Sequence, residues 1–287
     1  ELLEESVGKD AIEPLLKCDN EITPTILHAN PLRADAESVF AELEAAGAVL
    51  TPHPWLPDCR LAQGTGNLER LDAFRDGRVY VQDPAAHLAA LASGVEPGMQ
   101  VLDACAAPGG KSFAAAMQMR NEGSILSCDI HPHKLTLIEK GAERLGITML
   151  QTRLQNAAEH DPALDGQFDA VIADVPCSGL GVIRKKPDIR YKPLEPLARL
   201  PELQRAILEN VCRYVKPGGT LVYSTCTVLR RENEAVAEAF LKEHPDFSPE
   251  TIPAPEGFGL ENDGMLTLLP FKHDTDGFFI CRMRKHS

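Results

Sequence analysis

The residues best suited to chemistry are two cysteines, each of which follows an apolar run. The stretch DVPCSGLG (174–181) comes after FDAVIA and groups a carboxylate, a rigid proline and a thiol, at Asp174, Pro176 and Cys177. Cys226 lies among hydroxyl groups in STCT, directly after TLVY. On adjacent parallel strands the two thiols would face one pocket. Such a thiol can be packing, a metal ligand or a nucleophile, and the polar neighbours favour chemistry.

The other cysteines and a histidine pair are expected to be structural. No two cysteines have Cys-x-x-Cys or zinc spacing, so we expect reduced thiols and no metal. Five are predicted to pack as small hydrophobes: Cys18, Cys59, Cys128, Cys212 and Cys281. His131 and His133 form a His-x-His pair without a third ligand at suitable spacing, which favours helix-surface residues over a metal site.

A glycine-containing loop between a strand and a helix could hold a cofactor. In DACAAPGGKS (103–112), small residues permit close backbone approach, and Gly109 and Gly110 permit positive φ. The free amides at the helix start attract a carboxylate or phosphate. Asp129 ends the next predicted strand, where a carboxylate can accept hydrogen bonds from two ribose hydroxyls. Without a Gly-x-Gly-x-x-Gly pattern, these features favour S-adenosylmethionine over a dinucleotide.

The elements that position these residues alternate between strand and helix from residue 99 onward. Strands are predicted at 99–105, 123–129, 147–152, 168–175 and 218–226. Helices are predicted at 109–120, 131–146, 202–215 and 231–244, and a closing hairpin at 264–270 and 276–284. This alternation predicts a mostly parallel, doubly wound α/β sheet, whose ligands bind beyond the carboxyl ends of the strands.

The N-terminal part reads as a separate, smaller unit. Residues 1–22 predict one or two short amphipathic helices. Residues 23–82 predict a small α+β subdomain, with strands at 23–30, 59–63 and 77–83 and a helix at 36–47. The larger domain then covers residues 83–287.

Three stretches resemble one known family. DACAAPGGK, ADVPCSGLGVIRKKPDIRY and GGTLVYSTCT are similar, in this order, to motifs of the RNA cytosine-C5 methyltransferases. The likeness is strongest to the bacterial Fmu/Sun/RsmB branch, which methylates 16S ribosomal RNA, and covers about residues 20–285. It implies a class I S-adenosylmethionine-dependent methyltransferase sheet with a reversed last strand. Residues 23–82 would be a ferredoxin-like RNA-binding domain, and residues 1–22 a remnant of a missing helical RNA-binding domain.

The resemblance also implies roles for the site residues. Cys226 would be the nucleophile, Cys177 would help to free the product, and Asp174 would contact the cytosine. Lys111 is predicted to lower a thiol pKa or to steady Asp174. Asn156 stands where the family usually has an aspartate that contacts adenine, a departure that puts cofactor affinity in doubt. The predicted cofactor-binding set is Asp103, Ala104, Cys105, Ala106, Ala107, Pro108, Gly109, Gly110, Lys111, Asp129, Asn156 and Asp174.

A basic stretch beside the Cys177 loop is the predicted RNA contact. RKKPDIRYK carries a local charge of +4, whereas the whole chain carries −13, so non-specific RNA coating is not expected. The candidate RNA-binding residues are Arg184, Lys185, Lys186, Arg190, Tyr191 and Lys192. Tyr191 could stack on an unpaired base. Arg230 and Arg231 could extend the same face.

The leading hypothesis is therefore methylation of cytosine C5 in ribosomal RNA, and four alternatives are compared with it. The same chemistry on transfer RNA is not separated by pocket motifs. A non-catalytic RNA- or ribosome-binding assembly factor is disfavoured by the intact cysteines. An amino-group methyltransferase is disfavoured because a thiol replaces the expected aromatic residue, and an oxidoreductase because the glycine fingerprint is missing. No apolar run is long enough to span a membrane. We expect a cytoplasmic protein, and we expect it to be a monomer.

Overall fold

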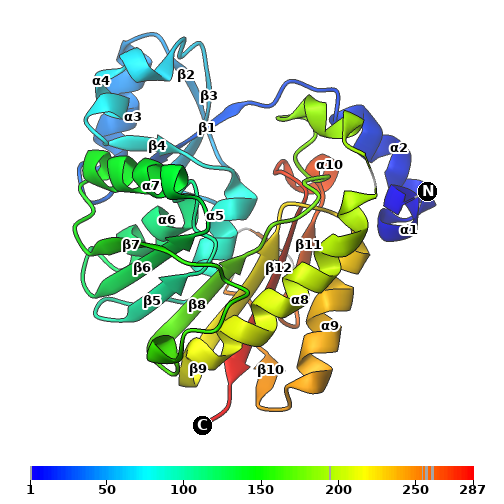
Figure 1. Ribbon diagram of the computed structural model, residues 1–287. Coiled ribbons are helices and arrows are strands. Elements are labelled where there is room, and N and C mark those ends of the chain that lie inside the picture. Colours follow the sequence, from blue (N-terminus) through cyan, green and yellow to red (C-terminus); the bar gives the residue numbers. More distant parts are fainter. Residues whose placement is uncertain (1, 194, 254, 256–257, 260–261) are drawn as a thin grey trace.

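Two sheets organise the protein. Figure 1 shows the computed structural model, which describes residues 2–193, 195–253, 255, 258–259 and 262–287. A four-stranded sheet lies in the N-terminal part and an eight-stranded sheet in the rest. The predicted α/β class is confirmed.

The larger sheet has five parallel strands followed by reversed ones. The parallel strands, in spatial order, are β7 (Leu150–Leu154), β6 (Ser124–Asp129), β5 (Gln100–Asp103), β8 (Phe168–Asp174) and β9 (Val215–Thr225). Antiparallel strands continue the sheet as β12 (Phe278–Lys285), β10 (Phe247–Pro249) and β11 (Met265–Leu268). The reversed last strand and the closing hairpin were predicted, whereas the three-residue β10 was not.

Helices cover both faces of this sheet, as Figure 1 shows. One face packs against α6 (Gly110–Gln118) and α7 (Pro132–Leu145), and the other against α8 (Leu200–Val211) and α9 (Glu234–Glu243). Residues 170–173 of β8 are at most 1% exposed, as expected for a central strand covered on both sides. Further helices are α5 (Pro84–Leu91), α10 (Pro270–His273), η2 (Pro162–Leu164), η3 (Pro187–Tyr191), η4 (Pro196–Arg199) and η5 (Cys212–Tyr214). The helix predicted at 231–244 begins only at Glu234, because Arg230–Glu232 form the 3₁₀ turn η6.

The smaller sheet has the strand order β2-β3-β1-β4, all antiparallel. Its elements are β1 (Thr25–Ala29), α3 (Ala36–Ala45), β2 (Val49–Pro52), β3 (Cys59–Gln63), η1 (Leu68–Arg70), α4 (Asp72–Arg75) and β4 (Val79–Val81). This β-α-β-β-α-β order is the ferredoxin-like arrangement that was expected. The domain limits at 22 and 82, and the RNA-binding role of this unit, stay predictions.

Buried polar contacts join the small sheet to α7. The amide of Asn30, which is fully buried, donates to the carbonyls of Gly77 (2.7 Å) and Leu145 (2.9 Å). Gly77 has φ +70, and a Cβ there would lie 1.9 Å from the carbonyl oxygen of Arg144. Only glycine therefore allows the two backbones to approach this closely.

The first residues form the two predicted short helices, α1 (Leu2–Val7) and α2 (Lys9–Cys18). Leu15 of α2 is fully buried in a cluster with Val228 and Leu269, against which Leu3 and Val7 also pack. The helices are thus anchored to the segment that follows Cys226.

Candidate functional site

The two candidate thiols meet at the carboxyl ends of β8 and β9. These strands are parallel neighbours, with Asp174 paired in register with Ser224. The loops that follow bring Cys177 Sγ to 3.2 Å from Cys226 Sγ, and both side chains are partly buried. The two thiols therefore lie side by side at one edge of the sheet, and a base-binding pocket at that edge stays a prediction.

The environment makes the two thiols unequal. A hydrogen bond from Cys177 lowers the pKa of Cys226, against the opposing effects of burial and of the Asp174 charge, and the charges of Lys111 and Lys186 lower it further. The same hydrogen bond, together with burial, raises the pKa of Cys177 well above its usual range. Cys226 is thus the member of the pair that ionises first, which suits a nucleophile.

Lys111 and Asp174 form an ion pair beside the thiols. Lys111 Nζ lies 2.5 Å from Asp174 Oδ2, and the side chains are 11% and 28% exposed. Ser224 donates its hydroxyl to the other carboxylate oxygen, Oδ1, at 2.8 Å. Burial alone would lower the pKa of Lys111, but Asp174 outweighs burial and the pKa is raised. Lys111 therefore stays charged; it pairs with Asp174, and its charge lowers the pKa of Cys226, while its part in a reaction stays a prediction.

The loop between β5 and α6 is held by a buried hydroxyl chain. Asp103 is fully buried and accepts a hydrogen bond from Ser112 (2.7 Å), which in turn contacts the hydroxyl of Ser127 at 2.8 Å. Burial raises the pKa of Asp103 to about 6. Gly109 has φ +110, and a Cβ there would lie 2.4 Å from the ring of Phe113. Ser112 and Ser127 were not singled out from the sequence, because nothing local relates them to Asp103.

Two further cofactor candidates lie at the ends of the next strands. Asp129, at the end of β6, is 8% exposed; its Oδ1 accepts from the backbone amide of His131 at 2.9 Å, and its Oδ2 lies 3.8 Å from Lys134 Nζ. Asn156 is exposed, and its amide is used locally, accepting from the backbone amide of Ala158 (3.1 Å). The ribose role of Asp129 and the adenine role of Asn156 stay predictions.

The basic stretch is divided between internal ion pairs and exposed residues. Arg184, with a side chain 7% exposed, lies 3.7 Å from Asp276. Lys185 bridges Asp83 (2.6 Å) and Asp276 (2.8 Å). Two cations of the predicted RNA face are therefore neutralised within the fold. The local charge of +4 counted only residues 184–192 and did not include these distant carboxylates.

The remaining candidates lie nearer the solvent. Arg190 is exposed but donates to the backbone carbonyl of Asp19 at 2.6 Å. Lys186 and Lys192 are exposed, and Tyr191 is 84% exposed, so a base could reach its ring. Arg230 pairs with Glu238 on the surface at 3.4 Å. An RNA-binding role for these residues stays a prediction.

Several buried polar residues behind the thiols were missed by sequence reasoning. Gln204, Glu232 and Asn233 are all fully buried and hydrogen-bond to the residues on either side of the two cysteines. RENE (231–234) was read only as the start of a helix. The available signal was a polar, charged segment three residues after STCT, where the start of a surface helix would have the same composition.

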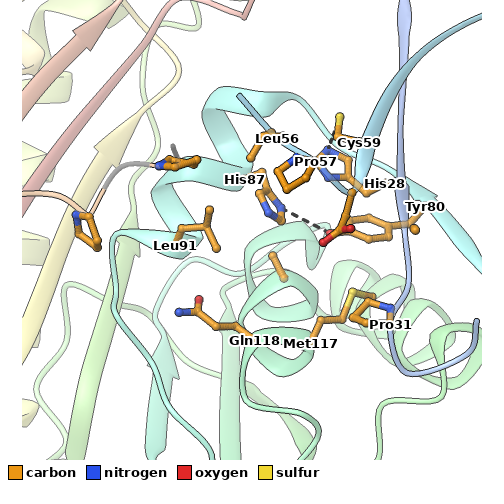
Figure 2. A pocket seen from close by; sticks show the side chains of 15 residues that line it. His28, Pro31, Leu56, Pro57, Cys59, Tyr80, His87, Leu91, Met117 and Gln118 are labelled. Atoms are coloured by element: carbon orange, nitrogen blue, oxygen red, sulfur yellow. Dashed lines mark hydrogen bonds between the residues drawn. The ribbon is translucent and has the colours of Figure 1, made fainter. Parts of the chain in front are cut away.

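A cavity of about 450 Å³ lies away from the thiols, between the small sheet and helices α5 and α6 (Figure 2). His28, Tyr80 and His87 line its polar side, and burial lowers the pKa of His28 to about 4 and of His87 to about 3. None of the predicted site residues lines this cavity. Its size suits a small ligand, and neither of the two candidate thiols lines it.

The five cysteines predicted to pack are buried, and burial raises their pKa values. Within the described ranges, no three His, Cys, Asp or Glu side chains are grouped to hold a metal ion. In the same ranges, no helix is long and apolar enough to cross a bilayer.

Comparisons with known proteins agree on one family. A family model described as "16S rRNA methyltransferase RsmB/F" matches residues 90–284. The chain is 40% identical, over 98% of its length, to "Probable ribosomal RNA small subunit methyltransferase B" of Bacillus subtilis, and 36% identical over 99% to the protein of that name in Synechocystis. It spans 64% and 65% of those relatives' lengths.

A solved structure agrees over nearly the whole chain. The structure of a methyltransferase homologue from Pyrococcus horikoshii is 26% identical and superposes with a TM-score of 0.83, covering 99% of this chain and 93% of that one. The ferredoxin-like unit and the methyltransferase sheet therefore occur together in a known fold.

Proposed function

Because the chain belongs to the 16S rRNA methyltransferase RsmB/F family, we propose that it methylates C5 of a cytosine in small-subunit ribosomal RNA through a covalent Cys226–C6 intermediate. The methyl donor is S-adenosylmethionine. The observation that carries the proposal is the sulfur pair, 3.2 Å apart and adjoining a buried lysine–carboxylate pair.

The chemistry explains why a low-pKa thiol is needed. Cytosine C5 is a poor nucleophile, but addition of the Cys226 thiolate to C6 converts the ring into an enamine whose C5 can attack a methyl group. The ring accepts the thiolate more readily when N3 is protonated or hydrogen-bonded. Asp174, whose charge Lys111 balances, is assigned to contact the base there: once N3 has taken a proton from solvent, the carboxylate accepts a hydrogen bond from it and so stabilises the protonated ring.

Cys177 completes the cycle. After methyl transfer, the C5 proton must leave and the Cys226–C6 bond must break by β-elimination. The pKa of free Cys177 is raised by its hydrogen bond to Cys226 and by the neighbouring negative charge. Once Cys226 is bonded to C6 it carries no charge, so Cys177 can ionise and act as the base. The same sulfur thus first supports the nucleophile and later frees the product.

The loop residues fit the donor. S-adenosylmethionine supplies an electrophilic methyl group when bound. The small side chains of residues 104–107 would allow its close approach, and the start of α6 offers backbone amides for its carboxylate. Asp129 would hold the ribose hydroxyls, and Asp103 Oδ1, for which the described residues offer no side-chain or backbone partner, would be an acceptor for the amino group.

A target base must leave its stack before C6 can meet a thiolate, so flipped or single-stranded cytosine is the expected substrate. The exposed Lys186, Tyr191 and Lys192 beside the Cys177 loop supply cations and a stacking surface for the flanking nucleotides.

Two variants test the assignment on small-subunit RNA with a labelled methyl donor. We expect Cys226→Ala to lose methyl transfer and Cys177→Ala to accumulate a protein–RNA adduct that survives a denaturing gel. Cys59→Ala, which alters a buried thiol of the small sheet, is the matched control and should behave as the unaltered protein. Full methylation by Cys226→Ala would reject the assigned nucleophile.

A further inference from the structure

Three fully buried polar side chains lie behind the two thiols: Gln204, Glu232 and Asn233. We propose that they are positioning residues, a polar clamp that holds Cys177 and Cys226 at reacting distance. This inference rests on the proposed function for its catalytic meaning, but its geometry can be tested without RNA.

Glu232 and Gln204 hold both neighbours of Cys177. The backbone amide of Ser178 donates to Glu232 Oε2 at 2.9 Å. Gln204 Nε2 donates to the same oxygen at 3.0 Å and to the carbonyl oxygen of Pro176, also at 3.0 Å. The residues before and after the thiol are therefore tied to one carboxylate.

Asn233 holds both neighbours of Cys226 in the same way. Thr225 donates its hydroxyl to Asn233 Oδ1 at 2.5 Å, and Asn233 Nδ2 donates to the carbonyl of Thr227 at 2.9 Å. Because Glu232 and Asn233 are consecutive, one short segment sets the position of both thiols. Its own place is set by Tyr223, whose hydroxyl donates to the Glu232 carbonyl.

Direct contacts between the two loops complete the arrangement. The hydroxyls of Ser178 and Thr227 lie 2.8 Å apart, and the backbone amide of Gly181 donates to the Cys226 carbonyl at 3.0 Å. A Cβ on Gly181 would lie 2.9 Å from that carbonyl oxygen and 1.9 Å from the Gly277 carbonyl oxygen, so this approach requires glycine.

The pattern of satisfied atoms shows what the clamp needs. Glu232 Oε2 receives both donors, whereas Glu232 Oε1 and Gln204 Oε1 have no partner among the residues described. Burying a carboxylate with one idle oxygen is a poor way to stabilise a core. Position 232 therefore needs a hydrogen-bond acceptor at one point, and a glutamine oxygen can supply that acceptor while leucine cannot.

The reaction gives the clamp its purpose. Cys226 must bond to C6 while Cys177 reaches the proton on the adjacent C5, so both sulfurs must address neighbouring atoms of one ring. Displacement of a reacting group by about 1 Å can cost roughly a hundredfold in rate. Two loops joined only at the strand ends would not hold such spacing without a shared support.

The thiol–disulfide equilibrium with glutathione measures the spacing directly. In each exchange the two thiols lose two protons and two electrons to form a disulfide, and one glutathione disulfide becomes two glutathione molecules. Mass spectrometry of the Cys177–Cys226 peptide pair in graded glutathione mixtures gives the equilibrium constant. Glu232→Leu should lower this constant by roughly tenfold or more, and Glu232→Gln by less than about threefold.

Controls separate the clamp from loss of fold. Glu238→Gln alters an exposed glutamate of α9, the helix that follows Glu232, and should leave the equilibrium unchanged. If Glu232→Leu does not fold, Gln204→Met removes only the Gln204 ties to Pro176 and Glu232 and should also lower the constant. With RNA, a folded clamp variant should accumulate covalent adduct, because release depends on Cys177 spacing.

Three results would overturn the inference: no Cys177–Cys226 disulfide in the unaltered protein, an unchanged constant in a folded Leu or Met variant, or equal losses in Glu232→Gln and Glu232→Leu. The equilibrium needs no methyl transfer. If the protein forms the disulfide as expected but does not methylate RNA, the clamp is supported and the proposed function is rejected.

Discussion

Replacing Cys177 by alanine removes the thiol that lies 3.2 Å from Cys226 Sγ, and we expect Cys226 to react more slowly with iodoacetamide. The thiolate is the reactive form, and the hydrogen bond from Cys177 is the largest influence that lowers the pKa of Cys226. Without it, less Cys226 is ionised at neutral pH.

The size of the effect follows from two opposing changes. A hydrogen bond to a charged group contributes about 1.5–3 kcal/mol, and a thiol is a weak donor, which favours the lower value. Alanine also admits more water, which partly offsets the loss by solvating the thiolate. Since about 1.4 kcal/mol corresponds to a factor of ten, alkylation at pH 7 should slow by roughly tenfold.

The assay follows alkylation of the Cys226 peptide by mass spectrometry between pH 6 and 10, which separates it from the other thiols. Cys177→Ser keeps a donor at the same place and should retain much of the rate. Cys59→Ala reports any general effect of removing a buried thiol. The midpoint of the profile should move to higher pH in Cys177→Ala, and the rate at high pH, where all the thiol is ionised, should not fall.

The reasoning would be refuted by a Cys177→Ala variant whose Cys226 is alkylated as fast as before at every pH. The thiolate would then owe its stability to the charges of Lys111 and Lys186. A slower rate at all pH values, without a change in the midpoint, would point instead to restricted access of the reagent.

Three other predictions concern the ion pair, the ribose site and a buried acid. Lys111→Met should lower the free energy of unfolding by about 2 kcal/mol or more in urea titrations, because it leaves the partly buried carboxylate of Asp174 without its partner. The double variant Lys111→Met with Asp174→Asn should recover part of the lost stability, and no recovery would contradict the pairing. Asp129→Ala should weaken S-adenosylmethionine binding by about 1–3 kcal/mol in calorimetry, and unchanged affinity would count against the ribose role. Asp103→Asn should stabilise the protein above pH 6 by roughly 3 kcal/mol. The pKa of Asp103 is raised from 3.8 to about 6 in the folded protein, so the folded protein loses stability as pH rises through this interval. Asparagine does not ionise and avoids this loss. Equal pH dependence of stability in both proteins would contradict the prediction.

Local chemistry made much of the site predictable. Cys177, Cys226 and Asp174 each follow an apolar run, and the carboxyl ends of parallel strands share one edge of a sheet, so their meeting could be inferred before any coordinates. The glycine loop after β5 was recognisable because small residues and two glycines separate a strand from a helix; of the two glycines, only Gly109 adopts the positive φ that was expected of both. Regular periodicity likewise predicted most helices and strands, whereas the reversal of β12 was implied by the family resemblance.

Contacts between distant segments decided the rest. The sequence by itself determined which residues carry chemistry and in which order their strands occur, because residue type and periodicity are local properties. Only the tertiary structure decided that Arg184 and Lys185 are neutralised by Asp83 and Asp276, about ninety residues or more away along the chain. It alone brought Gln204, Glu232 and Asn233 behind the thiols, since the partner of a buried hydrogen bond is fixed by packing rather than by spacing along the chain.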